Sequence, residues 1–220
     1  MERTPEPELM EEDEQARAYA EADFEDPHSR FMELLLEHSG GLPDAGLALD
    51  LGCGPADITL RFARAFPGWR VHGLDGSPAM LRYGAEAVAR AGLGEQVRLV
   101  EARLPEQAPP AEGYDFVFSN SLLHHLPDPS ILWSALGRWA RPGAGVFVMD
   151  LLRPTRREAA EALVELYAAG EPELLRHDFF HSLLAAYRLD EVDAQLRQVG
   201  LEALELRRVS DRHWIAYGHC

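Results

Sequence analysis

Two glycines and two aspartates have types and spacing that suit a ligand-binding turn. Gly52 and Gly54 follow the apolar run LALDL at residues 47–51, and a helical pattern comes next. Glycine lacks a Cβ, so the backbone can turn sharply and lie against a ligand, while the first amides of the helix offer donors. Asp50, just before the turn, can pair with an ammonium group. Asp75, about two dozen residues further on, stands where an acid typically binds ribose hydroxyls.

The spacing of the glycines argues against a dinucleotide ligand. Nicotinamide-binding proteins carry three glycines spaced G-x-G-x-x-G, whereas the third position here is Asp57. A carboxylate at the helix start disfavours a pyrophosphate and favours a zwitterionic or cationic ligand. Together with Asp50 and Asp75, the turn therefore predicts a nucleoside that carries an amino acid. A nicotinamide-dependent oxidoreductase is the less favoured alternative.

Short apolar runs alternate with helical patterns, and these elements must position the turn. The runs span 47–51, 69–74, 97–102, 114–119 and 145–152, and helical patterns span 57–66, 77–91 and 129–139. Nearly continuous apolar runs are typical of parallel strands covered on both faces. Two alternating runs around Ser210 and Asp211 predict a closing hairpin. We therefore expect an α/β fold: a single doubly wound, Rossmann-like, mostly parallel seven-stranded sheet with a C-terminal antiparallel hairpin and helical cap insertions.

Charge and composition narrow the class of partner. The formal net charge of −16 disfavours nucleic acid, because nonspecific binding to phosphates depends on Lys and Arg. No apolar run approaches the ~18 residues of a membrane span, and the N-terminus is acidic, unlike that of a signal peptide. We expect no membrane partner and a cytoplasmic location. The absence of lysine removes Schiff-base chemistry, and the two cysteines, Cys53 and Cys220, indicate neither a disulfide framework nor a cysteine metal site.

Four segments, taken in order and spacing, resemble the class I S-adenosylmethionine-dependent methyltransferases, particularly the small-molecule branch that includes quinone-biosynthesis enzymes. The segments are LDLGCGPADIT, LDGSPAML, YDFVFSNSLLHHLPDP and ARPGAGVFVMD, within residues 45–152. The resemblance implies S-adenosyl-L-methionine as cofactor and S-adenosyl-L-homocysteine as product. It implies methyl transfer to the oxygen, nitrogen or sulfur of a small-molecule acceptor. A non-catalytic or cofactor-remodelling S-adenosylmethionine-binding protein is the alternative, and the oligomeric state is not predicted.

The same resemblance assigns residues to the parts of the cofactor. It places Asp50, Gly52, Cys53 and Gly54 at the methionine part, Asp75 at the ribose, Gly76 and Met80 at the adenine, and Asn120, Ser121 and Leu122 at the methionine end. The Met80 thioether suits an aromatic ring, although a core position is equally compatible with the pattern. Arg103 stands where such enzymes often carry an aspartate for the adenine amino group, and a guanidinium accepts no hydrogen bond. Either a backbone carbonyl replaces the aspartate or the adenine sits differently.

His125 is the candidate catalytic residue, because the resemblance places it toward the reacting methyl. An imidazole can take a proton from a hydroxyl or thiol near neutral pH, but a packing role is open for His125 and for His124. The turn lacks the [DNS]PP[YFW] pattern of methyltransferases that act on base or glutamine amides. This difference disfavours nucleic-acid and release-factor substrates.

Acceptor specificity is expected from the helical segments outside the core. Aromatic side chains there would exclude water, and an arginine could pair with a carboxylate or phosphate. The candidates are Tyr19, Phe24, His28, Arg153, Tyr167, Arg176, Phe179, Phe180 and Tyr187. His177 and His181 lie four residues apart, but no third ligand is evident, so no metal is expected.

The predicted organisation is one methyltransferase domain over residues 15–220, after a disordered acidic tail at residues 1–14. The expected parts of the domain are an N-terminal helical cap at 15–40, with helices at 14–23 and 27–37, a cofactor-binding core at 45–152, a helical insertion or acceptor cap at 153–200 and closing strands at 201–220. Helices within the insertion are expected at 156–169 and 189–199.

Overall fold

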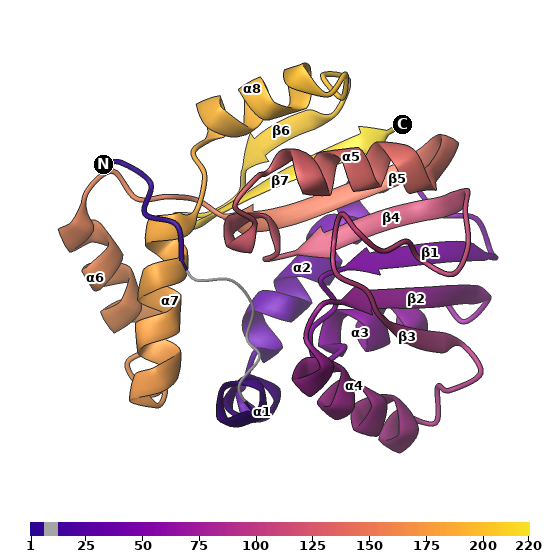
Figure 1. The fold of residues 1–220 in the computed structure, drawn as a ribbon, viewed down its shortest axis with the longest axis horizontal. Helices are drawn as coiled ribbons and strands as arrows, with labels where there is room; N and C mark the ends of the chain where they lie inside the picture. Colours follow the sequence, from indigo (N-terminus) through magenta and orange to yellow (C-terminus); the bar gives the residue numbers. More distant parts are fainter. Residues whose placement is uncertain (7–12) are drawn as a thin grey trace.

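Seven strands form one sheet at the centre of the computed structural model, which describes residues 1–6 and 13–220 (Figure 1). The strands are β1 (Gly46–Leu51), β2 (Trp69–Asp75), β3 (Val97–Glu101), β4 (Tyr114–Asn120), β5 (Ala140–Leu151), β6 (Glu205–Arg208) and β7 (His213–His219). Their order is β3-β2-β1-β4-β5-β7-β6, with β7 antiparallel to both its neighbours and the other pairs parallel. The strand order reverses between β1 and β4, which makes this point the expected ligand site of a doubly wound sheet.

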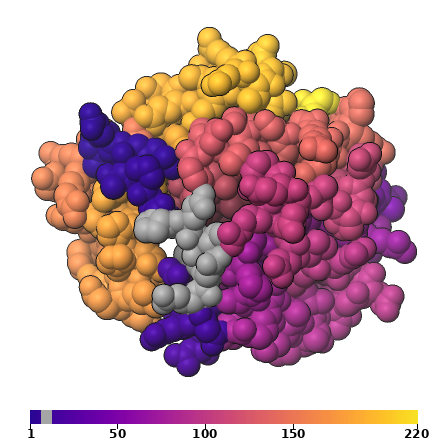
Figure 2. All heavy atoms as spheres, viewed as in Figure 1, coloured from indigo at the N-terminus to yellow at the C-terminus, as the bar shows by residue number. Residues whose placement is uncertain are grey.

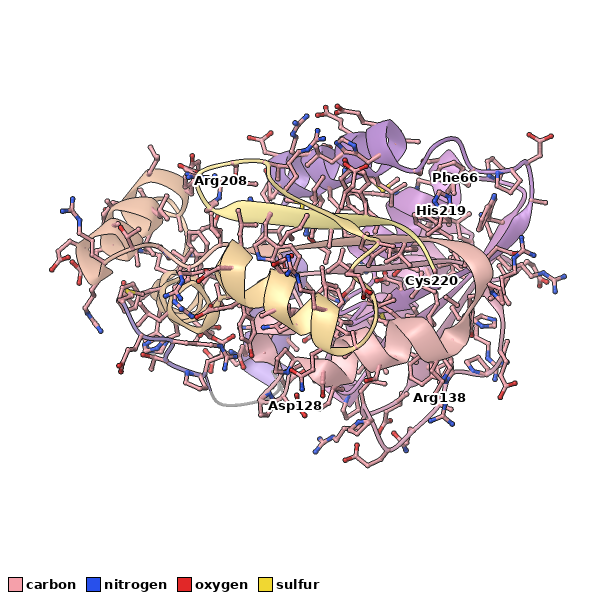
Figure 3. The ribbon with its side chains drawn as sticks, turned by 90° about the horizontal axis from the view of Figure 1, so that it is seen from above. Phe66, Asp128, Arg138, Arg208, His219 and Cys220 are labelled. Atoms are coloured by element: carbon pink, nitrogen blue, oxygen red, sulfur yellow. The ribbon has the colours of Figure 1, made fainter. Side chains whose placement is uncertain are left out.

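Helices cover both faces of this sheet. They are α1 (Asp13–Glu21), α2 (Glu25–His38), α3 (Asp57–Ala65), α4 (Pro78–Ala91), α5 (Ser130–Trp139), α6 (Arg157–Tyr167), α7 (Glu173–Ala185) and α8 (Leu189–Gln198), with a short 3-10 turn η1 (Leu123–His125) after β4. One core packs α2, α3 and α4 on the sheet, and the other packs α5 and α8. Figure 3 shows α5, which contains the labelled Arg138 and begins just after the labelled Asp128, beside α8. Among the described residues no helix is long and apolar enough to cross a membrane.

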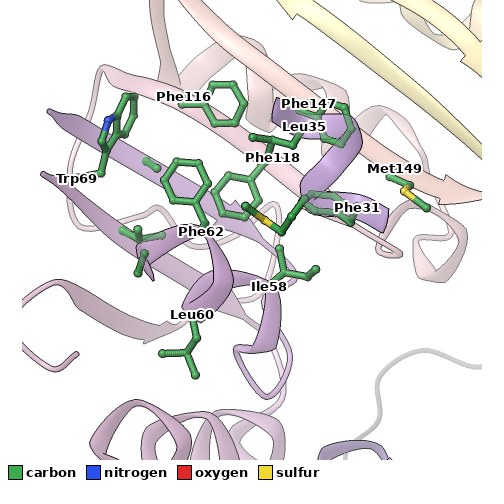
Figure 4. Close-up of a cluster of buried hydrophobic side chains, with 14 of the residues drawn as sticks. Phe31, Leu35, Ile58, Leu60, Phe62, Trp69, Phe116, Phe118, Phe147 and Met149 are labelled. Carbon is green, nitrogen blue, oxygen red and sulfur yellow. The ribbon is translucent and has the colours of Figure 1, made fainter. Parts of the chain in front are cut away.

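Aromatic side chains hold α2 and α3 against the sheet (Figure 4). Phe62 of α3 stacks on Phe118 of β4 with ring centroids 4.9 Å apart, and it meets Trp69 of β2 edge-on at 5.7 Å. Phe31 of α2 meets Phe147 of β5 edge-on at 5.1 Å. Such pairs contribute roughly 0.5–1.5 kcal/mol each beyond the burial of their area. The turn between β1 and α3 is therefore supported on a rigid base.

The predicted fold class is confirmed, and the differences are local. β5 begins at Ala140 rather than at residue 145, because Ala140 already pairs with Tyr114 of β4; after an irregularity the ladder resumes at Gly145, opposite Phe116. The polar and aromatic segment at residues 176–182 lies inside α7. The other predicted strands and helices begin and end within about two residues of the observed ones, which is the ordinary uncertainty of element boundaries. The division into caps and core, like the cytoplasmic location, stays a prediction.

Residues 1–6, which we call the N-terminal strap, differ from the predicted disordered tail. Arg3 donates to the backbone oxygens of Ala185 at 2.5 Å and His124 at 2.9 Å, and its guanidinium lies 4.2 Å from the ring centroid of Tyr187. Figure 2 shows the indigo strap against the orange helices α6 and α7 on one side and the rose part of the chain on the other. The amino group of Met1 also donates to the Thr155 oxygen at 2.9 Å, and the N–H of Thr4 donates to the Leu184 oxygen at 3.0 Å. Arg3 and these backbone contacts thus anchor a segment whose acidic composition indicates disorder.

The remainder of the predicted tail divides in two. Residues 7–12 lie outside the described residues. Asp13 and Glu14 form the first turn of α1, where carboxylates interact favourably with the helix dipole. The Asp13 carboxylate also binds Arg82 of α4, so the acidic start of this helix is paired with a charge on the core.

Candidate cofactor and acceptor site

A cavity of about 1260 Å³ opens at the carboxyl ends of β1, β2 and β4. Its volume exceeds the ~300–1,000 Å³ that is usual for one small-molecule pocket, so it has room for two ligands side by side. The residues singled out from the sequence that line it are Tyr19, Phe24, His28, Asp50, Gly52, Cys53, Gly54, Asp75, Gly76, Met80, Arg103, Asn120, Ser121, Leu122, His124, His125, Tyr167 and Phe179. The fold therefore brings almost all of the predicted site to one place.

The two glycines of the turn are required for different reasons. Gly52 has a φ of +73°, and a Cβ there would lie 2.9 Å from the Leu122 side chain, so packing within the protein excludes a larger residue. Gly54 has a φ of +52°, and a Cβ there would meet no atom within 4 Å. Because Gly54 lines the cavity, its bare backbone faces space that a ligand can occupy.

Asp75 joins the two loops at this edge of the sheet. Its carboxylate accepts hydrogen bonds from the backbone N–H of Gly54 and of Ser77, both at 2.8 Å. Burial raises the pKa of Asp75, and these two amide donors and nearby His125 act in the opposite direction. A carboxylate held in this way can still accept from ligand hydroxyls, because each oxygen has a second lone pair.

Asp50 is a buried carboxylate beside the turn, with 1% of its surface exposed. Thr59 donates its hydroxyl to Asp50 at 2.6 Å. Burial raises the pKa of Asp50 to about 7, and the nearby Asp75 adds to the rise. Pairing with a cationic group would favour the ionised form. The residues at this point of the cavity therefore fit an ammonium-bearing ligand.

Cys53 lies between the two glycines and is also buried. Burial raises the pKa of its thiol well above the usual value, and the carboxylates of Asp75 and Asp50 act in the same direction. The thiol therefore stays protonated at neutral pH and is unsuited to act as a nucleophile. Its contribution to the wall of the cavity is steric.

The end of β4 carries a strained residue in the wall. Ser121 has a φ of +57°, which is unusual for a residue with a side chain, and its N–H donates to Met149 at 2.9 Å. Such strain costs of order 1 kcal/mol and is often found at functional sites. The turn points the chain from Asn120 into Leu122, whose side chain closes over Gly52.

The opposite wall contains the residues expected near an adenine. Met80 is buried and packs with Ala16 and Tyr19. Arg103 lines the cavity, and its backbone N–H donates to the Gln107 side chain at 2.7 Å. Sequence reasoning missed several other polar residues of the wall, namely Glu106, Asp178, Ser182 and Arg212.

Three predicted acceptor residues form a row of rings along the cap. The rings of Tyr19 and Phe24 are 4.8 Å apart, and those of Phe24 and His28 are 5.2 Å apart. Burial raises the pKa of Tyr19 to about 12, so this hydroxyl stays neutral. Phe179 of α7 also lines the cavity. Together they provide an apolar wall with polar tips.

Asp57, which replaces the third glycine, has a structural partner set. It accepts from Arg61 at 2.7 Å and lies 2.6 Å from His28 Nδ1. Burial acts to raise the pKa of Asp57, but the bonds from His28 and Arg61 lower it overall. Its charge is therefore partly compensated, and it ties α2 to α3 beside the cavity.

Arg153 does not lie where the sequence placed it. Its side chain is 1% exposed and pairs with Glu191 of α8 at 2.5 Å, while it donates to the backbone oxygen of Ala186 at 3.0 Å. These contacts join the segment after β5 to α8, and Arg153 is not among the residues of the cavity wall. The same is true of three other acceptor candidates, Arg176, Phe180 and Tyr187, of which Arg176 pairs with Glu165.

His124 is held from behind by a carboxylate that sequence reasoning did not connect with it. Its Nδ1 lies 2.6 Å from Asp150 Oδ1, and Asp150 Oδ2 accepts from the N–H of Leu123 at 2.7 Å. Burial acts to lower the pKa of His124, but the Asp150 carboxylate raises it overall. Since His124 and Asp150 are each 2% exposed, the position of this imidazole is fixed.

His125 is paired with a carboxylate from the far end of the chain. Its Nδ1 lies 2.7 Å from Glu6 Oε1, and the hydroxyl of Ser182 donates to Glu6 at 3.2 Å. Burial acts to raise the pKa of Glu6, but the bond from His125 lowers it overall. Sequence reasoning missed Glu6, because a glutamate in an acidic, proline-bearing run has no local signal of burial.

Comparison with known proteins agrees with this geometry. Residues 49–146 match a family model described as a methyltransferase domain. A trans-aconitate 2-methyltransferase of Methylobacterium radiotolerans is 36% identical over 154 residues, which cover 68% of this chain and 54% of that protein. A demethylmenaquinone methyltransferase of Anoxybacillus flavithermus is 35% identical over 109 residues, covering 49% and 46% of the two chains. The chain thus spans about half the length of the curated relatives it matches.

Solved structures share the fold. A methyltransferase from Aquifex aeolicus superimposes with a TM-score of 0.58 at 21% identity, covering 87% of this chain and 97% of that one. The plantazolicin methyltransferase, solved with S-adenosylhomocysteine, gives 0.67 at 14% identity, covering 92% and 90%. Fold, turn and family match together indicate the class. Over residues 49–146 the chain carries a methyltransferase domain, and together with the shared fold this match supports a class I S-adenosylmethionine-dependent methyltransferase.

Proposed function

We propose that this chain binds S-adenosylmethionine in the cavity and transfers its methyl group to a small-molecule acceptor. The observation that carries the proposal is the bare backbone of Gly54, which faces open space in the cavity that the buried Asp50 and the half-buried Asp75 also line. Asp50 would meet the ammonium group of the cofactor, and Asp75 would accept from the ribose. When bound, the cofactor supplies an activated methyl group. The family match disfavours the nicotinamide alternative.

The second part of the cavity would hold the acceptor. Its wall combines the ring row of Tyr19, Phe24 and His28 with Phe179 and with the polar groups around His125. Apolar walls exclude water and bind an apolar body, and a few polar groups orient it. We infer an acceptor with an apolar body and one hydroxyl, thiol or amine that loses a proton. The net charge of −16 supports a small molecule over nucleic acid.

In this reaction the chain itself would bind the cofactor and the acceptor, align them, and accept the proton that the acceptor loses. Alignment of two bound reactants can supply ~7–11 kcal/mol of the barrier reduction, so the walls of the cavity matter more than a catalytic triad. His125, which is paired with Glu6 and lines the cavity, offers a proton acceptor. Loss of the His125 side chain should therefore lower turnover.

Two measurements separate the proposal from its alternatives. Calorimetric titration with S-adenosylhomocysteine and with NAD should show binding of the first and none of the second. Release of S-adenosylhomocysteine should then be followed over a panel of phenols, thiols, amines and carboxylic acids. Cofactor binding without turnover over the whole panel would favour a sensor, and a different adenosyl ligand in the mass spectrum of the purified protein would favour a remodelled cofactor.

Replacing His125 with alanine should lower turnover by about 10²-fold or more, in the range of general-base effects. Binding of S-adenosylhomocysteine should change little, because Asp50, Gly54 and Asp75 are intact. The matched control is His177→Ala, since His177 lies on α7 with 64% of its side chain exposed. Equal turnover of the two variants, measured at saturating cofactor, would remove His125 from the chemistry.

A further inference from the structure

Three side chains from two distant parts of the chain meet beside the acceptor region. The ligand atoms of Glu6, His124 and His125 all lie within 4.8 Å of one another, and no other trio of histidines, cysteines or acids in residues 1–6 and 13–220 does so. His124 and Glu6 have side chains that are 2% and 8% exposed, and His125 is 23% exposed. Both histidines line the cavity. The cluster is thus a largely dry recess with access to bound ligands.

The distances within the cluster distinguish its two contacts. Glu6 Oε1 and His125 Nδ1, at 2.7 Å, are at hydrogen-bonding distance. Glu6 Oε1 and His124 Nε2, at 3.7 Å, are too far apart for a hydrogen bond. Two ligands at ~2.0–2.1 Å from one tetrahedral ion are themselves about 3.4 Å apart. The longer contact therefore has the spacing of two atoms that share a cation, and a small movement of Glu6 would equalise the two.

Asp150 completes the arrangement from behind. It holds His124 Nδ1 at 2.6 Å, so that Nε2 is the nitrogen turned toward Glu6. Histidines that bind metals usually donate their other ring N–H to a carboxylate or carbonyl, which fixes the tautomer and makes the ligand nitrogen more basic. Ser182 plays the equivalent part for Glu6 by donating its hydroxyl. Supporting groups of the kind found around bound metals are thus present at both His124 and Glu6.

We propose that Glu6, His124 and His125 bind one divalent transition-metal ion, with zinc as the preferred ion. Two imidazole nitrogens and one carboxylate form a ligand set known from catalytic zinc sites, which keep a fourth position open. The open position would face the cavity, since both histidines line it. The N-terminal strap, anchored by Arg3, delivers the third ligand.

A role for the ion rests on the proposed function. An ion at this place would bind the hydroxyl or thiol of the acceptor and lower its pKa. With the ion bound, His125 would be one of its ligands and the proton would pass to water, whereas without the ion His125 is the proton acceptor described above. The acceptor would then be held as an anion next to the methionine end of the cavity. Binding of the ion itself needs neither the cofactor nor turnover, so it can be tested separately.

The test is a metal titration of the full chain after removal of bound metal with a chelator. Zn²⁺ binding is measured by calorimetry, and Co²⁺ binding by visible absorption, in the parent, in Glu6→Gln and in the double variant His177→Ala/His181→Ala. The double variant is the matched control, because these two histidines also lie close together, with ring centroids 4.3 Å apart on α7, but outside the cluster. Glu6→Gln preserves the shape of the side chain, and unfolding midpoints of all three proteins verify that each is folded.

We expect one Zn²⁺ per chain in the parent and the double variant, and at least tenfold weaker binding in Glu6→Gln. The inference is overturned if the parent binds neither ion with a Kd below about 100 µM, or if Glu6→Gln binds Zn²⁺ as tightly as the parent. Titration with S-adenosylhomocysteine on the same samples keeps the two proposals apart. Cofactor binding without metal binding removes only the metal site, and metal binding without cofactor binding removes only the proposed function.

Discussion

Replacing Gly54 with valine should abolish binding of S-adenosylhomocysteine, whereas the same change at Gly92 should leave binding intact. Both glycines have a positive φ, +52° and +68°, and a Cβ at either would meet no protein atom within 4 Å. The strain of a side chain in this conformation costs roughly 1–2 kcal/mol at each position. The two positions differ in what lies outside them, because Gly54 lines the cavity and Gly92 caps the C-terminal end of α4.

Comparing Gly54→Val with Gly92→Val therefore separates the effect of backbone strain from the effect of filling the cavity. Unfolding in urea should show similar destabilisation of the two variants. Calorimetry should show affinity reduced by at least about 100-fold for Gly54→Val, equal to about 2.7 kcal/mol, and unchanged for Gly92→Val. Retained affinity in Gly54→Val would mean that the cofactor does not approach this backbone, and the proposed function would lose its principal support.

Replacing Asp50 with asparagine should stabilise the protein at pH 8 and weaken cofactor binding. The pKa of Asp50 in the folded protein is about 7, above the ordinary ~3.9 of the unfolded chain. The folded state thus binds more protons than the unfolded state between these values, and its stability falls as pH rises from about 4 to 7. Asparagine escapes this loss and can still accept from Thr59. The expected gain is roughly 2–4 kcal/mol at pH 8.

Replacing Asp50 with asparagine should raise the stability of the protein and lower its affinity for the cofactor. Urea unfolding at pH 8 should show the variant to be the more stable protein, and the difference should nearly vanish at pH 4. Affinity for S-adenosylhomocysteine should drop at least tenfold, since the ammonium group loses its partner. Affinity of the parent should also rise with pH up to about 7, because the ionised carboxylate is the binding form. Asp193→Asn, on the exposed side of α8, controls for the loss of one charge.

A result of the opposite sign would be equally informative. Lower stability of Asp50→Asn at pH 8 would show that the carboxylate is ionised and well solvated in the folded protein. The burial of Asp50, which is 1% exposed, would then not govern its ionisation. A solvated carboxylate would give this part of the cavity no special preference for a cationic ligand.

Local residues were sufficient for the fold class and for the cofactor part of the cavity. The apolar run forms β1, and Gly52 and Gly54 form the tight turn after it, as their local sequence indicates. Parallel strands then bring their carboxyl ends together, so Asp50, Asp75 and Asn120 line one cavity although they are far apart in sequence. These positions follow from periodicity and from the geometry of a doubly wound sheet.

Long-range packing decided the acceptor part of the cavity. Arg153 lies just after β5, yet it pairs with Glu191 of α8 and leaves the wall. Glu6 stands in a run with no apolar period, yet Arg3 anchors the strap and Glu6 meets His125. The partner of a side chain depends on which distant element lies within hydrogen-bonding distance. The local sequence pattern does not indicate which element that is. Turn and strand chemistry could therefore be predicted from neighbours in sequence, whereas the charge pairs beside the acceptor depend on neighbours in space.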